Sequence, residues 1–126
     1  MIADDHRLFA ESLMTVLTED ERVDVVGIAD NGREAVELAA DLQPDVILMD
    51  LNMPVLDGFE ATQQMRDGGS DAQILILTGA DEAIGSEDAA AAGASGYLRK
   101  EQSVAELKQV LLEAVSLAAV LGPSGR

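Results

Sequence analysis

Short apolar runs alternate along this chain with longer segments in which apolar side chains recur every three or four residues. The runs occupy residues 2–3, 23–29, 46–49, 74–77 and 96–98, and each has the length of a single strand. In the intervening segments, spacings such as Phe9, Leu13 and Val16 place apolar side chains on one face of a helix. The pattern therefore predicts five units, each made of a strand and a helix.

The clearest helix is the last one, where Val104, Leu107 and Leu111 step by three or four residues. Residues 81–93 are helix-prone but rich in alanine, so we expect a thin core-facing side there. Consecutive strands joined by helices run parallel, because only a crossover connection lets both strands point the same way. The sequence thus predicts an α/β domain with a parallel sheet.

Length and charge narrow the class of protein. The 126 residues, 48% of them hydrophobic, suffice for one core but not for two ordinary domains. A net charge of −16, from 24 acidic and 8 basic residues, repels nucleic-acid phosphates. We therefore expect no direct DNA binding by this segment.

Compartment is indicated by what the sequence does not contain. No apolar run approaches the ~20 residues needed to cross a bilayer, so no membrane association is expected. The chain contains no cysteine, which excludes disulfides and thiolate metal sites. These features predict a cytoplasmic protein.

Polar side chains follow the apolar runs at the points where four of the strands end. Asp4 and Asp5 follow the first run, Asp50 the third, Thr78 the fourth and Lys100 the fifth. The carboxyl ends of parallel strands share one rim of the sheet, so these side chains should converge there. Adjacent carboxylates raise one another's pKa unless a cation lies among them, and carboxylate oxygens with water suit Mg²⁺.

A metal beside a further aspartate makes that aspartate a plausible nucleophile toward phosphorus. Lys100 and Thr78 would then offer a positive charge and a hydrogen bond to the phosphoryl oxygens.

This constellation resembles the receiver domain of two-component response regulators. The resemblance rests on the acidic pair, on Asp50 followed by Asn52-Met53-Pro54 and Gly58, and on the threonine and the lysine in the same order. The motifs "DDH" and "GYLRK" look most like the NarL/FixJ (LuxR-type) subfamily. The resemblance covers residues 1–119 and leaves 120–126, with Gly122-Pro123-Ser124-Gly125, as a linker or C-terminal tail. It implies a flavodoxin-like (βα)5 three-layer sandwich with strand order 2-1-3-4-5.

The resemblance also implies a role for each site residue. Asp50 would accept a phosphoryl group from a sensor histidine kinase, and Thr78 and Lys100 would contact that group. Tyr97 matches the aromatic that changes rotamer when the threonine moves. Mg²⁺ or Mn²⁺ would be held by Asp4, Asp5, Asp50 and the backbone carbonyl of Asn52.

The implied protein is a phosphoacceptor switch and not an enzyme, apart from its self-catalysed phosphotransfer and dephosphorylation. We expect phosphorylation to shift the surface formed by residues 81–93, the 96–98 strand and the last helix, with homodimerisation as one outcome. Transcription would be controlled through a DNA-binding domain outside this chain. The alternative is a stand-alone receiver that acts in a phosphorelay or through protein contacts.

Simpler roles compete at several positions. Asp4 and Asp5 could cap the first helix, Asp57 could cap the helix that begins near Gly58, and Tyr97 could be a packing aromatic. His6, the only histidine, could suggest a phosphohistidine or a metal ligand, but a histidine at a helix start is expected to be solvated.

Two other function classes have the same architecture. A haloacid-dehalogenase-type enzyme requires a second aspartate where Asn52 stands. A flavodoxin-type module requires a phosphate loop where Asp4-Asp5-His6 stands.

The first strand departs from the receiver pattern, because only Met1, Ile2 and Ala3 precede the acidic pair. So short a central strand leaves neighbouring backbone groups unpaired. We expect that adding four or five apolar residues before Met1 raises the melting temperature.

Overall fold

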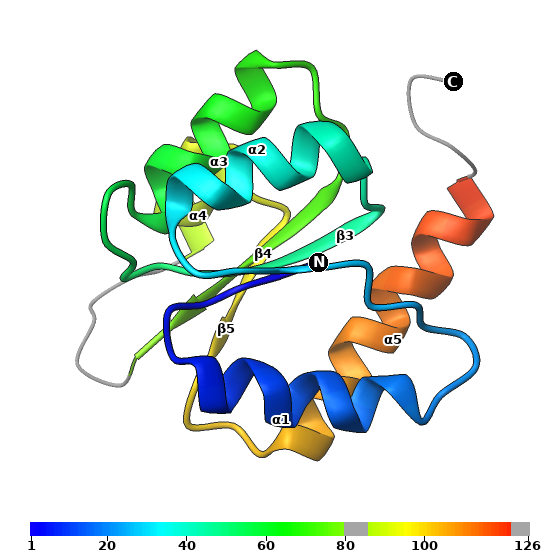
Figure 1. Cartoon of the computed structure of the whole chain (residues 1–126). Helices are drawn as coiled ribbons and strands as arrows, with labels where there is room; N and C mark the ends of the chain where they lie inside the picture. Colours follow the sequence, from blue (N-terminus) through cyan, green and yellow to red (C-terminus); the bar gives the residue numbers. More distant parts are fainter. Residues whose placement is uncertain (80–85, 122–126) are drawn as a thin grey trace.

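The structure is a computed structural model that describes residues 1–79 and 86–121. Five strands alternate with five helices in this described part of the chain (Figure 1). The strands are β1 (Ile2–Ala3), β2 (Ile28–Ala29), β3 (Val46–Asp50), β4 (Gln73–Thr78) and β5 (Gly96–Arg99). The helices are α1 (Arg7–Thr18), α2 (Gly32–Leu42), α3 (Gly58–Asp67), α4 (Ser86–Ala92) and α5 (Val104–Leu121).

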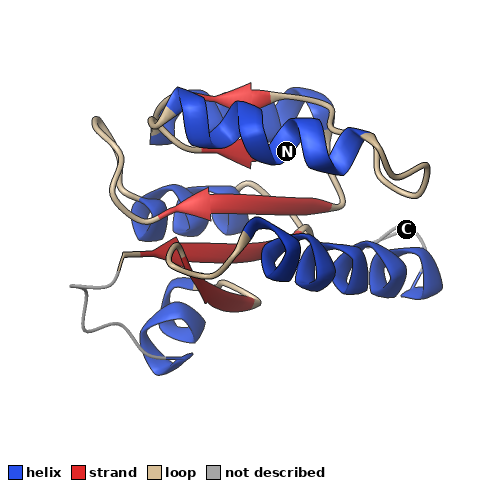
Figure 2. Cartoon of the chain, turned by 90° about the horizontal axis from the view of Figure 1, so that it is seen from below, coloured by secondary structure: helices blue, strands red, loops and turns tan. Residues whose placement is uncertain are grey.

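All five strands are parallel and form one sheet in the order β2-β1-β3-β4-β5, which confirms the predicted topology. Ile2 pairs with Ile28 on one side and with Leu48 on the other, so β1 is the strand at which the winding reverses. The strands lie side by side across the middle of the molecule (Figure 2). Helices α1 and α5 cover one face of the sheet, and α2, α3 and α4 cover the other (Figure 1). The predicted three-layer sandwich is therefore correct.

Two cores lie on the two faces of the sheet, because successive strand residues point to opposite sides. Ile47 and Met49 of β3 join the cluster beneath α2 and α3. Leu48, between them, joins the cluster beneath α1 and α5 together with Leu13 and Leu107. A strand covered on both faces must be apolar at every position, which explains the unbroken run before Asp50.

Helix α3 begins immediately behind the end of β3. The Asp57 carboxylate accepts a hydrogen bond from the Glu60 N–H, and the Glu60 carboxylate accepts one from the Asp57 N–H, so Asp57 caps α3 as predicted. A Cβ on Gly58 would lie 2.5 Å from the carbonyl oxygen of Asp50. Only glycine lets the helix start this close to the strand, and this approach shapes the loop behind Asp50.

Strand β2 is shorter than the sequence predicted, since 23–29 was expected and only Ile28–Ala29 forms a strand. The reason is the length of β1, whose two residues pair with just those two residues. Residues 23–26 instead line a cavity of about 550 Å³, together with Met1, Val46 and Leu111. The buried Met1 ammonium faces this cavity region and donates a hydrogen bond to the Val46 carbonyl at 2.9 Å. We call this space the β1 cavity.

The ends of two predicted segments fall outside the described residues. Helix α4 begins at Ser86, and positions 81–85 of the predicted helix-prone stretch lie outside the structure's described part. Helix α5 continues to Leu121, two residues into the stretch 120–126, whose remainder including Gly122-Pro123-Ser124-Gly125 is likewise not described. Among the helices that are described, none is both long and apolar enough to cross a bilayer.

Candidate functional site

Four of the predicted site residues meet at the carboxyl end of the sheet. Asp4 follows β1, Asp50 ends β3, Thr78 ends β4 and Lys100 follows β5. Asp4 and Asp50 are only 1% and 3% exposed, and Thr78 is fully buried. Burial of two carboxylates this close together is costly unless cations or hydrogen bonds compensate them. The structure thus brings the side chains of Asp4, Asp50 and Lys100 together, as predicted, and places Thr78 at the end of the strand next to β3.

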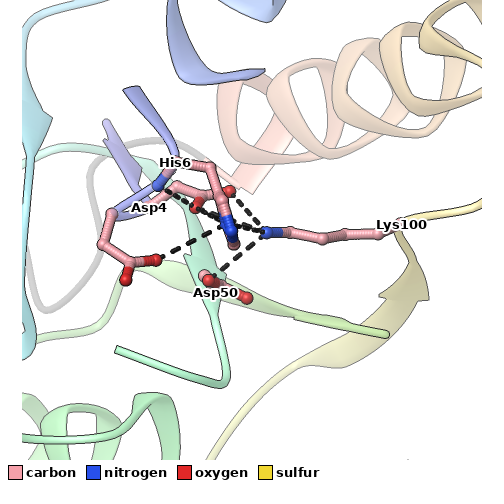
Figure 3. A network of polar contacts seen from close by, with 5 residues as sticks. Asp4, His6, Asp50 and Lys100 are labelled. Atoms are coloured by element: carbon pink, nitrogen blue, oxygen red, sulfur yellow. Dashed lines mark hydrogen bonds and ion pairs between the residues drawn. The ribbon is translucent and has the colours of Figure 1, made fainter. Parts of the chain in front are cut away.

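Lys100 compensates part of the negative charge. Its Nζ lies 3.1 Å from Asp4 Oδ2 and 3.4 Å from Asp50 Oδ2, so one ammonium bridges both buried carboxylates (Figure 3). The ammonium also lies 5.2 Å from the centre of the Phe9 ring, within cation–π range.

The acidic residues fit a divalent cation. One donor atom from each of Asp4, Asp5, His6 and Asp50 lies within 4.8 Å of the others. Among the described residues, Asp4 Oδ2 and Asp50 Oδ2 have no hydrogen-bond partner, although both are within ion-pair distance of Lys100. One ammonium cannot neutralise three carboxylates, and buried oxygens without donors are the ligands that Mg²⁺ and Mn²⁺ take in proteins.

The pKa of Asp50 reflects this crowding. Burial, and after it the Asp4 charge, raise the pKa of its carboxyl from 3.8 to about 7, although the Lys100 charge opposes both effects. Near neutral pH, Asp50 therefore binds a proton in competition with any cation at the site. A bound divalent cation would favour the ionised, nucleophilic carboxylate.

Thr78 and Tyr97 make contacts with β5 and the core. The Thr78 hydroxyl donates a hydrogen bond to the Leu98 carbonyl at 3.3 Å, and the Lys100 N–H donates to the Thr78 carbonyl at 2.8 Å. The half-buried Tyr97 packs against the core beneath α2 and α3, with the Arg99 guanidinium 5.9 Å from its ring centre. Both residues thus belong to the contact between β4 and β5, and their switching roles stay predictions.

Backbone hydrogen bonds fix both ends of the loop that follows Asp50. The Leu51 N–H donates to the Leu77 carbonyl, and the Gly58 N–H donates to the Leu51 carbonyl. Asn52 lies in this loop, and its carbonyl as a metal ligand stays a prediction. Val55, 70% exposed, has a φ of 75°, a left-handed conformation that a β-branched residue adopts at a cost.

Capping does not explain the acidic pair. His6 occupies the N-cap position of α1 and makes no side-chain capping bond. The Asp4 Oδ1 atom instead accepts the His6 N–H at 2.8 Å, which turns the chain between β1 and α1.

His6 lies beside these residues, although it was expected only to be solvated. Its imidazole is 69% exposed, but Nδ1 lies 3.0 Å from Lys100 Nζ and 3.3 Å from Asp4 Oδ1. Its place directly after the acidic pair was the only available signal.

Comparisons with known proteins agree with this geometry. Residues 1–112 match the sequence profile of the response regulator receiver domain. The signal receiver domain of the response regulator NarL from Mycobacterium tuberculosis superposes with a TM-score of 0.83 at 33% identity, covering 91% of this chain and 93% of that one.

Longer relatives match over the same region. The transcriptional regulatory protein DegU of Brevibacillus brevis is 39% identical over 119 residues, which cover 94% of this chain and 49% of DegU. The nitrate/nitrite response regulator protein NarP of Escherichia coli (strain K12) is 40% identical over 119 residues, with 94% of this chain and 54% of NarP covered. This chain spans about half the length of these relatives.

Proposed function

The chain belongs to the response regulator receiver domain family, the phosphoacceptor switches of two-component systems, and on that premise we propose that Asp50 accepts the phosphoryl group. Its relatives are of the NarL/FixJ type, as the motifs predicted. The observation that carries the proposal is the buried Asp50 carboxylate at the end of β3, with Lys100 and Asp4 beside it. The dehalogenase-type and flavodoxin-type alternatives lose their basis with this family membership.

In the proposed reaction, an Asp50 carboxylate oxygen attacks phosphorus and forms an acyl phosphate. The bond that breaks joins phosphorus to the donor, which is a phosphohistidine when a sensor histidine kinase is the partner. Lys100, now paired with the two aspartates, would transfer its contact with Asp50 to the phosphoryl oxygens. Mg²⁺ or Mn²⁺, held by Asp4, Asp5, Asp50 and the Asn52 carbonyl, would neutralise the charge on those oxygens. Hydrolysis of the same bond by water would be the self-catalysed return step.

We propose that Thr78 passes the change to the surface. Its hydroxyl now bonds to the Leu98 carbonyl of β5, and a turn of Thr78 toward a phosphoryl oxygen would give up that bond. Tyr97 precedes Leu98 on β5, so loss of that bond would affect β5 first. Helices α4 and α5 flank β5 in the chain, and we propose that these three elements form the surface that would respond. Amide exchange with and without beryllofluoride tests this step, and unchanged protection over residues 86–105 would refute it.

The partners of the whole protein are part of the proposal. DegU, a relative named as a transcriptional regulatory protein, is about twice as long, which supports control of transcription through a separate DNA-binding domain. Homodimerisation on phosphorylation is a further part of the proposal. The alternative is a receiver that acts alone in a phosphorelay or through protein contacts.

Acetyl phosphate labelling tests the phosphoacceptor directly. Incubation with acetyl phosphate and Mg²⁺, followed by intact mass measurement, should add one phosphoryl group to the wild type and none to Asp50→Asn. Asp57→Asn is the matched control, because Asp57 lies in the same loop and caps α3, and it should still be labelled. Labelling of Asp50→Asn to the wild-type extent would assign the phosphoryl group to another residue.

A further inference from the structure

His6 presents a ring nitrogen to the acidic site. The hydrogen bond from its backbone N–H to Asp4 Oδ1 folds the chain back at this point. As a result, Nδ1 lies 3.3 Å from Asp4 Oδ1 and 3.5 Å from Asp5 Oδ1 (Figure 3). The His6 side chain is 69% exposed, and these contacts of Nδ1 are with carboxylates of the acidic site.

The contact with Lys100 indicates which form of the ring is present. The shortest contact of Nδ1 is with Lys100 Nζ, at 3.0 Å. An ammonium can only donate hydrogen bonds, so Nδ1 accepts this one in the neutral tautomer that carries its proton on Nε2. In that tautomer the lone pair of Nδ1 is directed at a cation.

The Lys100 ammonium is surrounded by one imidazole nitrogen and several carboxylate oxygens. Besides His6 Nδ1, Lys100 Nζ has Asp4 Oδ2 at 3.1 Å, Asp4 Oδ1 at 3.3 Å and Asp50 Oδ2 at 3.4 Å around it. The ammonium thus marks a position where one nitrogen and several carboxylate oxygens converge. Two of these oxygens are buried, and neither has a hydrogen-bond partner among the described residues.

We propose that His6 Nδ1 is a ligand of the site's divalent metal and makes the site prefer late first-row transition ions, such as Ni²⁺ and Co²⁺, to Mg²⁺. This inference rests on the metal site of the proposed function. Imidazole nitrogen is a good ligand for these ions, whereas Mg²⁺ takes oxygen ligands almost exclusively. The donor atoms of Asp4, Asp5, His6 and Asp50 already lie within 4.8 Å of one another, close to the spacing within one coordination shell.

Small movements complete such a shell. Asp5 and His6 are on the exposed side of the cluster, at 36% and 69% exposure, so their side chains can rotate toward the ion. The ion would repel the Lys100 ammonium from the two buried aspartates. Lys100 is then free to face the phosphoryl group, so the metal that occupies the site also sets the position of this lysine.

The test uses the purified, untagged chain, in which His6 is the sole imidazole. Calorimetric titration with NiCl₂ and with MgCl₂ is compared for wild type and His6→Gln. We expect His6→Gln to weaken Ni²⁺ binding by about tenfold or more, and Mg²⁺ binding by much less. Arg7→Gln is the matched control, because it changes the neighbouring exposed residue, which contacts Glu11 and Asp30, and it should keep the preference for Ni²⁺.

Pulsed electron paramagnetic resonance of bound Mn²⁺ gives a second readout. Coordination by His6 predicts nitrogen modulation in the wild type that disappears in His6→Gln. Equal Ni²⁺ affinity in the two proteins, or the same nitrogen signal in both, would overturn the inference. Failure of the wild type to take up a phosphoryl group with Mg²⁺ would instead reject the proposed function, since that labelling experiment does not involve Ni²⁺.

Discussion

Extension of β1 into the β1 cavity should stabilise this chain substantially. The change is the addition of four apolar β-branched residues, valine and isoleucine, ahead of Met1. Met1 and Ala3 face the core under α2 and α3, whereas Ile2 faces the core under α1 and α5, so added side chains would alternate between two apolar cores. Residues 23–26 and Val46 line the cavity and offer backbone partners on both sides.

The size of the effect depends mainly on the Met1 ammonium. Burial lowers its pKa from 8.0 to about 6, with the Asp45 charge opposing the shift, which costs about 3 kcal/mol below pH 6 and about half as much at pH 7. Burial of each new side chain gains about 1.5–3 kcal/mol, but ordering each residue costs about as much, so these two contributions nearly cancel. New backbone hydrogen bonds add about 1 kcal/mol each. A gain of about 3–5 kcal/mol should raise the melting temperature by roughly 10 °C or more.

The pH dependence has a definite sign. Because the folded-state pKa of the amino group lies below its unfolded value, the unfolded chain binds more protons between pH 6 and pH 8. Stability of the unextended chain from this group therefore rises across that window. The extended chain should lack this rise, because its amino group lies away from the cavity.

Thermal melts followed by circular dichroism measure both effects. Parent, apolar extension and a Gly-Ser extension of equal length are compared at each pH, so that titration of Asp50 affects all three equally. The Gly-Ser chain relocates the charge without apolar side chains, and its difference from the apolar chain measures side-chain burial. An apolar extension that melts no higher than the parent at pH 7 would refute the reasoning.

Three further predictions concern the site and its loop. In melts without divalent cations, Asp50→Asn should be more stable than wild type at pH 8 and no more stable at pH 4. The reason is that the raised Asp50 pKa favours the protonated form in the fold, so wild-type stability is lost as pH rises through about 7. Val55→Gly should gain about 0.5–1 kcal/mol in urea unfolding by relieving the positive φ, whereas Val55→Ala should not. Gly58→Ala should lose about 2 kcal/mol or more, because its Cβ would lie 2.5 Å from the Asp50 carbonyl oxygen. Gly68→Ala should change stability little, because its Cβ would lie 3.4 Å from the Gln64 carbonyl oxygen.

The parallel sheet and the acidic rim could be predicted from local pattern, whereas the strand order followed only from the resemblance to receiver domains. Apolar runs that end in Asp50, Thr78 and Lys100 need only the rule that parallel strands share a carboxyl rim. The strand content of residues 23–27 could not be predicted, because it depends on whether β1 offers a partner.

The contacts of His6 and the backbone conformation of Val55 could not be predicted from the sequence either. The His6 contact arises from a turn stabilised by Asp4, and the apolar or polar character of His6 carries no sign of it. The strain at Val55 was hidden for a related reason, since no glycine marks that position.

The ion pair between Lys100 and Asp4 joins residues 96 positions apart in the chain. During synthesis, and before any cation binds, the first four strands therefore bring the Asp4 and Asp50 carboxyl groups together while the Lys100 ammonium is still missing. Arrival of β5 would deliver the missing ammonium, which makes the last strand the one that permits the rim to close. A nascent or truncated chain that stops before residue 100 lacks this ammonium, so its Asp4 and Asp50 carboxylates should repel each other. Such a chain should be cleaved by proteases more readily than the full chain.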